Sequence, residues 1–349
     1  MVHTDRPRSQ IKIALASFYA RPLARGCFHV LIFLYACVLL ADFLAPYRYD
    51  DEDRNYSYAP PTKIQWVDQG KLSWPFIYGS TLIFNQYHKR SFNVDRTQKY
   101  PLKIFNKGRL FGVEQPGRFY IWGADAQGRD IFSRVLYGGR ISLSIGLIGS
   151  LIAFTIGLLV GGIAGYFGGW IDSLLMRICE MFMLLPGFYL MLALRSVVPD
   201  NISAFQIYVM VILILSFIGW ASLARIIRGM SLSLSQRDFV LAAKAMGVSD
   251  MRIILTHILP HTLSYSMVAI MLSIPAYILS EAGLSLLGLG IQDPIPSWGN
   301  MLSSAMGIVQ IQFAPWIMVP GILIFVTVMC FNIVGDGLRD AFDPLMKVK

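Results

Sequence analysis

Six long apolar segments constrain the fold of this chain more than any other feature of its sequence. A helix needs about 20 apolar residues to cross a hydrocarbon core about 30 Å thick, and it satisfies its own backbone hydrogen bonds there. The chain has 349 residues, of which 55% are hydrophobic. The pattern predicts an all-α polytopic membrane protein with six transmembrane helices, at about residues 28–47, 141–166, 173–194, 207–223, 266–287 and 313–334.

The distribution of charge predicts the orientation of the chain. The N-terminal tail, residues 1–27, carries five basic residues and one acid, which places it in the cytoplasm. Six spans then return the C-terminal tail, residues 336–349, to the same side. The net charge is +9, but half of the 30 Lys and Arg residues lie among acids in residues 48–140. Most of the others flank apolar spans, so the charge indicates membrane lipid and argues against a nucleic-acid partner.

Residues 48–122 form a hydrophilic insertion on the extracytoplasmic side. It opens with an acidic run and a Pro-Pro pair, and strand-like aromatic runs then flank Asp68-Gln69-Gly70 and Asn106-Lys107-Gly108. Each such pattern is typical of a β-hairpin with glycine in the turn. We therefore expect a small β-rich subdomain over about residues 60–120.

Residues 123–140 precede the second span and favour an amphipathic helix at the membrane interface. Apolar side chains recur there at helical spacing from Ile131. Three arginine side chains are long enough to reach water from an apolar surface, Arg129, Arg134 and Arg140.

The second span carries a stripe of small residues, one every four positions. Such a stripe lets another helix approach closely, so that van der Waals packing holds the pair together. The partner helix belongs either to this chain or to a second subunit. The residues of the stripe are Gly149, Ala153, Gly157, Gly161 and Gly165.

The fifth span contains two residues that are unusual in an apolar helix. Pro275 should kink the helix, because it has no N–H to donate to the preceding turn. Glu281 should face protein or a water-filled path and not lipid. Either these residues line or gate a translocation path, or Glu281 is a buried side chain satisfied by neighbouring backbone groups.

The loop at residues 237–261 is built as two short helices and not as an ordinary connector. Strong helix formers run to Met246, and Gly247 stands where a helix ends in the left-handed conformation. Ser249 is a good N-cap for a second helix, with Asp250 in its first turn. Pro260 then stops or kinks the pattern.

The sequence contains none of the motifs that would indicate chemistry in this chain. It has no Gly-x4-Gly-Lys-Ser/Thr phosphate loop, no His-Glu-x-x-His and no Gly-x-Ser-x-Gly. The four cysteines lie in or beside apolar spans without metal-ligand spacing. His257 and His261 are four residues apart, but Pro260 lies between them and no third ligand is near in sequence. We therefore expect no catalytic site, cofactor or metal.

Four stretches resemble one family. In the loop, Ala242-Ala243, Gly247 and Leu259-Pro260 are spaced as in the signature loop of ABC importer permeases, with Leu241 where that family usually has Glu. Residues 123–143 resemble a hallmark of the C-type subunits of the oligopeptide/dipeptide/nickel branch, with Ala124 in place of the usual Thr. Residues 288–302 and 335–344 resemble two further stretches of the same branch.

The resemblance implies a type I ABC importer permease fold, with a five-helix core at 141–335. It implies a bacterial inner-membrane complex with a sister permease subunit, two cytoplasmic ABC ATPase subunits and an extracytoplasmic solute-binding protein. The insertion is not typical of the family, and its own pattern favours either a contact surface for that binding protein or a lid that stabilises the outer face. The loop would be a coupling helix docked on an ATPase. Its coupling residues would be Asp238, Leu241, Ala242, Ala243, Lys244, Met246, Gly247 and Asp250.

Two functional hypotheses from different classes follow. The first is a permease subunit that forms half of a translocation path for oligopeptides or dipeptides, with nickel chelates and peptide-like antibiotics as alternative substrates. The second is an ATPase-independent secondary transporter that uses Glu281 to couple an ion. Inverted repeats would support the second hypothesis, and none is evident in the sequence.

Overall fold

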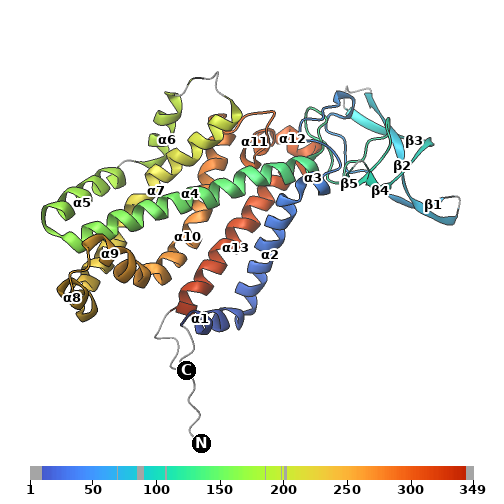
Figure 1. The fold of residues 1–349 in the computed structure, drawn as a ribbon. Helices are drawn as coiled ribbons and strands as arrows, with labels where there is room; N and C mark the ends of the chain where they lie inside the picture. Colours follow the sequence, from blue (N-terminus) through green and yellow to red (C-terminus); the bar gives the residue numbers. More distant parts are fainter. Residues whose placement is uncertain are drawn as a thin grey trace, which may run out of the picture. The chain divides into compact units, whose positions relative to one another are not determined.

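The computed structural model describes residues 10–68, 70–84, 90–106, 108–184, 186–197, 199 and 203–342. The ends of both predicted tails, and Gln69 and Lys107 of the two predicted turns, lie outside the described residues. The chain divides into two compact units (Figure 1). Unit 1 comprises Met1–Ile32, Ser144–Ser280 and Val326–Lys349, and unit 2 comprises Phe33–Leu143 and Glu281–Phe325. Four helices, α2, α4, α10 and α13, have one end in unit 1 and the other end in unit 2.

Most of the described chain is helical, as predicted. The helices are α1 (Gln10–Tyr19), α2 (Pro22–Leu39), α3 (Ala41–Leu44), α4 (Ile131–Phe167), α5 (Gly169–Leu184), α6 (Gly187–Ser196), α7 (Ala204–Ser235), α8 (Asp238–Ala245), α9 (Asp250–Ile253), α10 (Leu259–Leu286), α11 (Trp298–Ser303), α12 (Ile308–Phe313) and α13 (Val319–Phe342). Shorter helical turns cover Arg54–Tyr56 (η1), Ile254–Ile258 (η2) and Pro315–Met318 (η3).

Five helical segments in the described residues are long and apolar enough to cross a membrane. They are Pro22–Leu39, Ile131–Phe167, Ala204–Ser235, Asp250–Leu286 and Pro315–Phe342. The segment predicted as the third span is divided into α5, of 16 residues, and α6, of 10 residues, with Pro186 between them. Proline removes a backbone donor and clashes with the preceding turn. The prediction of six continuous spans is therefore not confirmed at this segment.

The prediction of a separate interfacial helix over residues 123–140 was wrong. Residues 123–130 form a loop, and α4 begins at Ile131 and continues without a break to Phe167. Asp130 starts the helix, because its Oδ2 accepts hydrogen bonds from the backbone N–H of Ser133 (2.8 Å) and from its hydroxyl (2.6 Å). The cap sets the start of the helix, and the predicted second span, residues 141–166, lies within it.

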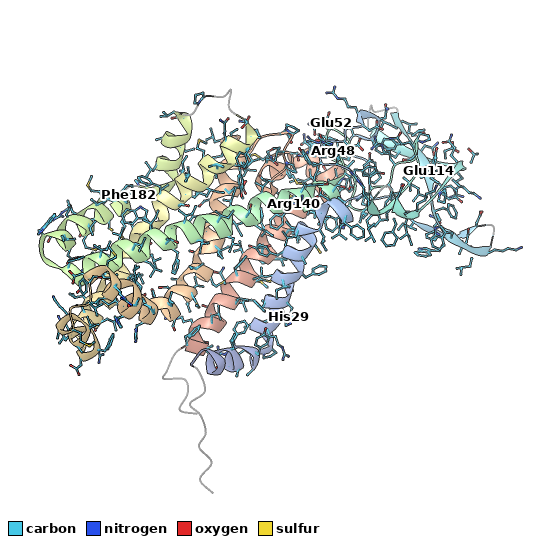
Figure 2. All side chains as sticks on the ribbon, viewed as in Figure 1. His29, Arg48, Glu52, Glu114, Arg140 and Phe182 are labelled. Carbon is cyan, nitrogen blue, oxygen red and sulfur yellow. The ribbon has the colours of Figure 1, made fainter. Side chains whose placement is uncertain are left out.

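In unit 1, α5 packs against α7 through a polar pair and an aromatic cluster. Arg228 donates to Asp172 through Nε at 2.9 Å and also through Nη2. The ring of Phe182 lies edge-on to Phe217, with 4.7 Å between centroids (Figure 2). Arg177 and Glu180, three residues apart on α5, form a 3.0 Å ion pair, because side chains at this spacing lie on one face of a helix.

In unit 2, the insertion forms two small antiparallel sheets. The first has the order β1 (Gln65–Asp68), β2 (Lys71–Phe84), β3 (Arg90–Pro101), and the second joins β4 (Lys103–Asn106) to β5 (Arg109–Gly112). Gly70 and Gly108 adopt positive φ values of 82° and 79° beside the predicted turns. The β-rich insertion and its two hairpins are confirmed, whereas the long β2–β3 pairing was not predicted.

Candidate functional site

The loop between α7 and α10 is a compact corner of two helices. Gly247 has φ +76°, and its N–H donates to the carbonyl of Lys244 at 3.0 Å. The N–H of Val248 donates to the carbonyl of Ala243 at 3.2 Å. These two bonds form a Schellman motif, which closes the C-terminus of a helix on a left-handed residue. The glycine corner predicted from the sequence is therefore confirmed.

A small apolar cluster holds the corner together. Val240 and Ala243 of α8 pack with Ile253 and Ile258, and Tyr166 of α4 packs against the same cluster. Ala243 is 2% exposed. The side chain of Ala243 packs into this cluster and is not accessible to a partner protein. Its position therefore does not support the prediction that Ala243 contacts a partner.

The opposite face of the corner is exposed and partly apolar. Met246 is 77% exposed and Leu241 is 51% exposed. Large apolar side chains at this level of exposure mark an interaction surface when they gather on one element. The other predicted coupling residues that are exposed are Asp238, Ala242, Lys244, Gly247 and Asp250.

Two polar contacts connect the corner to the end of α4. The hydroxyl of Tyr166 donates to Asp250 at 2.5 Å. The ammonium of Lys244 lies 6.0 Å from the centroid of the same ring. A single residue of α4 therefore contacts α8 and α9 together, so that a displacement of the corner reaches α4 directly.

The chain leaves the corner through a turn of π-helix. Residues Ile254–Ile258 form this wide turn, and α10 follows without interruption. Pro260 therefore does not end the helical pattern, as the sequence suggested it might. A wide turn leaves room for a proline ring that would otherwise clash with the preceding turn, and such turns are frequent at functional sites.

His257 and His261 are also accounted for at this turn. The Nδ1 atom of His261 lies 2.8 Å from the carbonyl oxygen of His257, and its ring stacks on Phe239 with 5.1 Å between centroids. Within the part of the chain that the structure describes, no group of three His, Cys, Asp or Glu side chains is placed to hold a metal.

The small-residue stripe of α4 packs against α7 of the same chain, which answers the question left open by the sequence. A Cβ added to Gly161 would lie 2.4 Å from the carbonyl oxygen of Ala224. A Cβ on Gly165 would lie 2.4 Å from that of Arg228, and on Gly157 3.0 Å from that of Trp220. The contacts advance together along both helices, so α4 and α7 run parallel with their backbones close.

A second set of glycines on α4 accommodates α10. A Cβ on Gly162 would lie 2.8 Å from Leu259, and one on Gly146 2.7 Å from Ile278. Gly149 is part of the stripe, but a Cβ added to it would lie 2.8 Å from Cδ1 of the Tyr277 ring on α10. Helices α7 and α10, which the corner joins, thus both pack on α4.

Neither residue predicted to line the path is exposed. Pro275 is buried inside α10, and Glu281 is 0% exposed. The hydroxyl of Ser142 donates to one carboxylate oxygen of Glu281 at 2.9 Å, and that of Ser285 donates to the other at 2.7 Å. Two hydroxyl groups therefore satisfy the buried carboxylate, and not the backbone groups that the sequence suggested.

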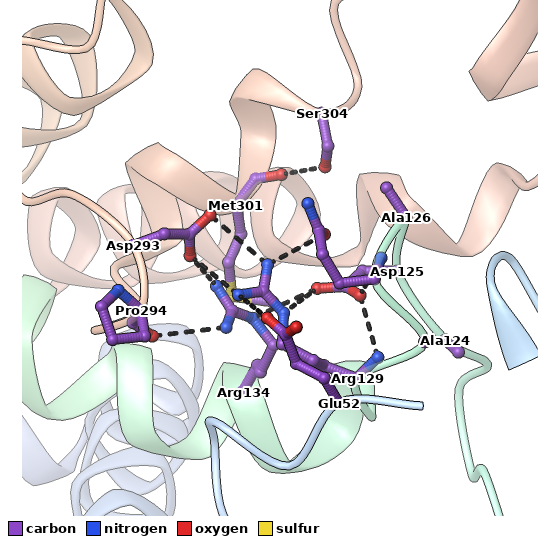
Figure 3. A network of polar contacts seen from close by, with 12 residues as sticks. Glu52, Ala124, Asp125, Ala126, Arg129, Arg134, Asp293, Pro294, Met301 and Ser304 are labelled. Carbon is purple, nitrogen blue, oxygen red and sulfur yellow. Dashed lines mark hydrogen bonds and ion pairs between the residues drawn. The ribbon is translucent and has the colours of Figure 1, made fainter. Parts of the chain in front are cut away.

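An extended polar network joins the start of α4 to the loop after α10, all within unit 2 (Figure 3). Arg129 donates to Asp125 at 2.7 Å and to Asp293 at 3.2 Å. Arg134 donates to Asp293 at 2.7 Å and to the carbonyl of Tyr49 at 3.1 Å. Burial opposes the ionisation of Asp293, but the two guanidinium groups outweigh it and lower the pKa of its carboxyl.

The network corrects the prediction that these arginines reach out to water. Arg129 is 4% exposed and Arg134 is 2% exposed. Arg140 differs, because it donates to Asp42 at 2.7 Å and to the carbonyls of Val38 and Leu39, each at 2.9 Å (Figure 2). Sequence reasoning missed Asp293, and its only signal was an acid beside Pro294 in an otherwise uncharged loop.

Comparisons with known proteins agree with this architecture. Residues 157–348 match the family described as "Binding-protein-dependent transport system inner membrane component", and residues 9–61 match "N-terminal TM domain of oligopeptide transport permease C". Residues 62–156 lie between the two matched ranges.

Three curated relatives are similar over about the same length. The oligopeptide transport system permease protein OppC of Haemophilus influenzae is 42% identical, over 65% of this chain and 70% of its own. The dipeptide transport system permease protein DppC of Bacillus subtilis is 40% identical, over 66% and 71%. The glutathione transport system permease protein GsiD of Escherichia coli O6:K15:H31 is 45% identical, over 66% and 74%.

A solved structure of the MetNI methionine ABC transporter in an inward-facing conformation aligns with a TM-score of 0.44 at 19% identity, covering 60% of this chain and 97% of that one. The family match alone spans more than half of this chain, and the permease from Haemophilus influenzae is 42% identical to it over the aligned residues. The chain therefore belongs to the family of binding-protein-dependent transport system inner membrane components.

Proposed function

We propose that this chain is a permease subunit of an ATP-driven importer of peptides, and that it forms half of the translocation path. The observation that carries the proposal is its 40–45% identity to permeases named for oligopeptides, dipeptides and glutathione. Those three substrate classes share peptide bonds. Nickel chelates and peptide-like antibiotics are other cargoes of the same architecture, so the narrower substrate has to be measured.

The energy is supplied by partner ATPases, and this chain hydrolyses no nucleotide. The complex contains a sister permease, two cytoplasmic ATPase subunits and an extracytoplasmic solute-binding protein. Residues 237–261 face the cytoplasm and dock on one ATPase through Leu241, Ala242 and Met246, with Asp238, Lys244, Gly247 and Asp250 around them. The exposure of Leu241 and Met246 supports this assignment, since large apolar side chains that are exposed together mark an interaction surface.

Coupling proceeds by a change of packing. Closure of the ATPase dimer displaces the corner, which joins α7 to α10, and both helices then shift on the glycine surfaces of α4. Interfaces between packed helices are bistable, so a small displacement at the corner selects between inward- and outward-open arrangements. Tyr166 supports this route because it touches both α8 and α9. Pro275 and Glu281 remain proposed elements of the gate.

The testing experiment is a mild-detergent purification of the tagged chain from its native membrane, with every co-purifying chain identified. We expect a second permease, ATPase subunits and a solute-binding protein whose bound ligand identifies the substrate. Purified complexes in liposomes should accumulate that ligand only when ATP is enclosed with the ATPases. A chain that purifies alone and transports along a proton gradient without ATP would establish the secondary-transporter hypothesis instead.

A further inference from the structure

The hairpin β4–β5 has one packed strand and one exposed strand. The packed strand, β5, contacts α3, and Arg109 of β5 donates to the carbonyl of Ala45 at 3.4 Å (Figure 1). Phe111 of β5 lies 6.3 Å from the ring of Phe132 at the start of α4. On β4, in contrast, Ile104 is 52% exposed and Phe105 is 71% exposed. The hairpin is thus anchored on one side and presents apolar side chains on the other.

The position of this hairpin along α2 places it at the membrane surface. The last span residues, Leu39 and Leu40, are 72% and 54% exposed, as a lipid-facing surface requires. Phe43 lies in α3, four residues beyond Leu39, where α2 ends. The headgroup layer on each side of the hydrocarbon core is about 5–8 Å thick. The ring of Phe105 lies 6.1 Å from that of Phe43, so the hairpin meets this layer.

The surroundings have the composition of a membrane interface. Arg140 closes the carbonyl end of α2 and pairs with Asp42, whose pKa is lowered by that hydrogen bond. The guanidinium of Arg140 lies 5.3 Å from the ring centroid of Tyr137. Aromatic rings and long cations are enriched where helices leave the hydrocarbon core. The pair of Arg140 and Asp42 beside the hairpin therefore marks the depth at which α2 leaves the hydrocarbon core.

The backbone at Phe105 adds an independent observation. Its φ is +56°, in the left-handed region that aromatic residues rarely occupy. Glycine or asparagine would adopt this conformation with less strain. A strained position that nevertheless carries a large exposed aromatic side chain indicates that the side chain has a role outside the fold.

A neighbouring tryptophan extends the same surface. Trp74 of β2 is 60% exposed, and its indole N–H donates to the carbonyl of Leu102, just before β4, at 2.7 Å. The hydrogen bond fixes the ring beside β4 with its polar atom satisfied. A tryptophan with a bonded N–H and an exposed apolar face suits the headgroup layer.

We propose that Ile104, Phe105 and Trp74 form an interfacial anchor that inserts into the lipid headgroup layer beside α2. The anchor holds the insertion down on the membrane surface and does not bind the solute-binding protein. The inference rests on the proposed function only in that α2 crosses the membrane.

The test uses the full-length chain in lipid nanodiscs of phosphatidylethanolamine and phosphatidylglycerol. Its four native cysteines are replaced, and a nitroxide label is attached at Phe105→Cys or, separately, at Ile104→Cys. The matched control is Asn93→Cys, an exposed polar position on β3. Accessibility to oxygen, which concentrates in lipid, is compared with accessibility to a water-soluble nickel chelate.

We expect the oxygen-to-nickel ratio at positions 104 and 105 to exceed that at position 93 several-fold. Equal ratios at all three positions would overturn the proposal. Low accessibility to both reagents at 104 and 105 would also overturn it, because a protein would then cover the hairpin. Because the sites are exposed and tested separately, one misfolded variant leaves the other as a test. ATP-driven uptake is measured on the same assembled complex, so a failure of the proposed function is distinguished from a failure of the anchor.

Discussion

At the scale of single residues, Gly247 is the position on which the shape of the corner depends. Its backbone is left-handed, yet no atom lies within 4 Å of an added Cβ. A substitution there therefore tests the backbone alone, without a steric clash. The glycines of the α4 stripe differ, because an added Cβ there would meet atoms of a neighbouring helix.

We predict that Gly247→Val uncouples ATP hydrolysis from uptake. A β-branched residue in the left-handed region costs about 1–2 kcal/mol, enough to open the corner without unfolding the spans. Uptake should fall at least tenfold in liposomes, while basal ATP hydrolysis by the complex persists. Gly247→Asn is the matched control, because asparagine tolerates the same conformation. Normal uptake by the valine variant would argue against a role for the corner in coupling.

The second residue-scale prediction concerns Asp130, which is 2% exposed. Burial raises the pKa of its carboxyl to about 7, against the lowering effect of two hydrogen bonds from Ser133. The folded state thus keeps a proton that the unfolded state has already lost. Stability therefore falls as pH rises from 3.8 to about 7, and the loss is complete above that value.

Asp130→Asn should remove this pH dependence, because the amide resembles the protonated carboxyl and can still accept from Ser133. We expect the Tm of the variant in detergent to exceed that of the wild-type chain at pH 8, and the difference to shrink as pH falls and to vanish only below about pH 3.8. A Tm difference that is constant with pH would show that Asp130 does not titrate in this range.

At the scale of elements, the contact between α4 and α7 decides where the core of unit 1 lies. The atom of α7 nearest to a Cβ added at Gly157, Gly161 or Gly165 is in each case a backbone carbonyl oxygen, which cannot move away as the end of a side chain can. Overpacking such a contact costs about 1–3 kcal/mol. The stripe predicted from the sequence therefore works within one chain and is not a surface reserved for the sister subunit.

Gly161→Ala should lower the Tm by several degrees, because its Cβ would lie 2.4 Å from a backbone oxygen. The control is Gly229→Ala on α7, where no atom lies within 4 Å of the new Cβ. That substitution should be neutral or slightly stabilising, since alanine favours helix over glycine. Equal effects from the two substitutions, measured by thermal unfolding in detergent, would contradict the packing described here.

At the scale of the whole molecule, the charge distribution and the number of proposed spans predict which regions lie on opposite sides of the membrane. Thr97 of the insertion and Ala242 of the corner are both exposed in the structure, so folding does not hide either one. In a background free of native cysteines, Thr97→Cys should react with a membrane-impermeant maleimide on intact spheroplasts. Ala242→Cys should react only after the membrane is opened. Labelling of both in intact spheroplasts would invalidate the proposed topology.

The sequence alone located most elements but not their partners. Apolar length located the spans, and the glycines at 70, 108 and 247 located three chain reversals, because these signals are local. The continuation of β2 past Pro75 and its pairing with β3 were missed, since pairing depends on contacts distant in sequence. Among the site residues, the glycine corner could be predicted, whereas the buried position of Ala243 could not.

What the sequence by itself determined is therefore a membrane-spanning helical chain with a β-rich insertion and a glycine corner, because hydrophobic length and backbone freedom are properties of short segments. Only the tertiary structure decided that the α4 stripe receives α7, that Arg129 and Arg134 are buried against acids, and that Glu281 is enclosed by serines. Glycine, arginine and glutamate residues can each face lipid, water or protein. Only the packing of segments that are distant in sequence determines which environment a given residue has.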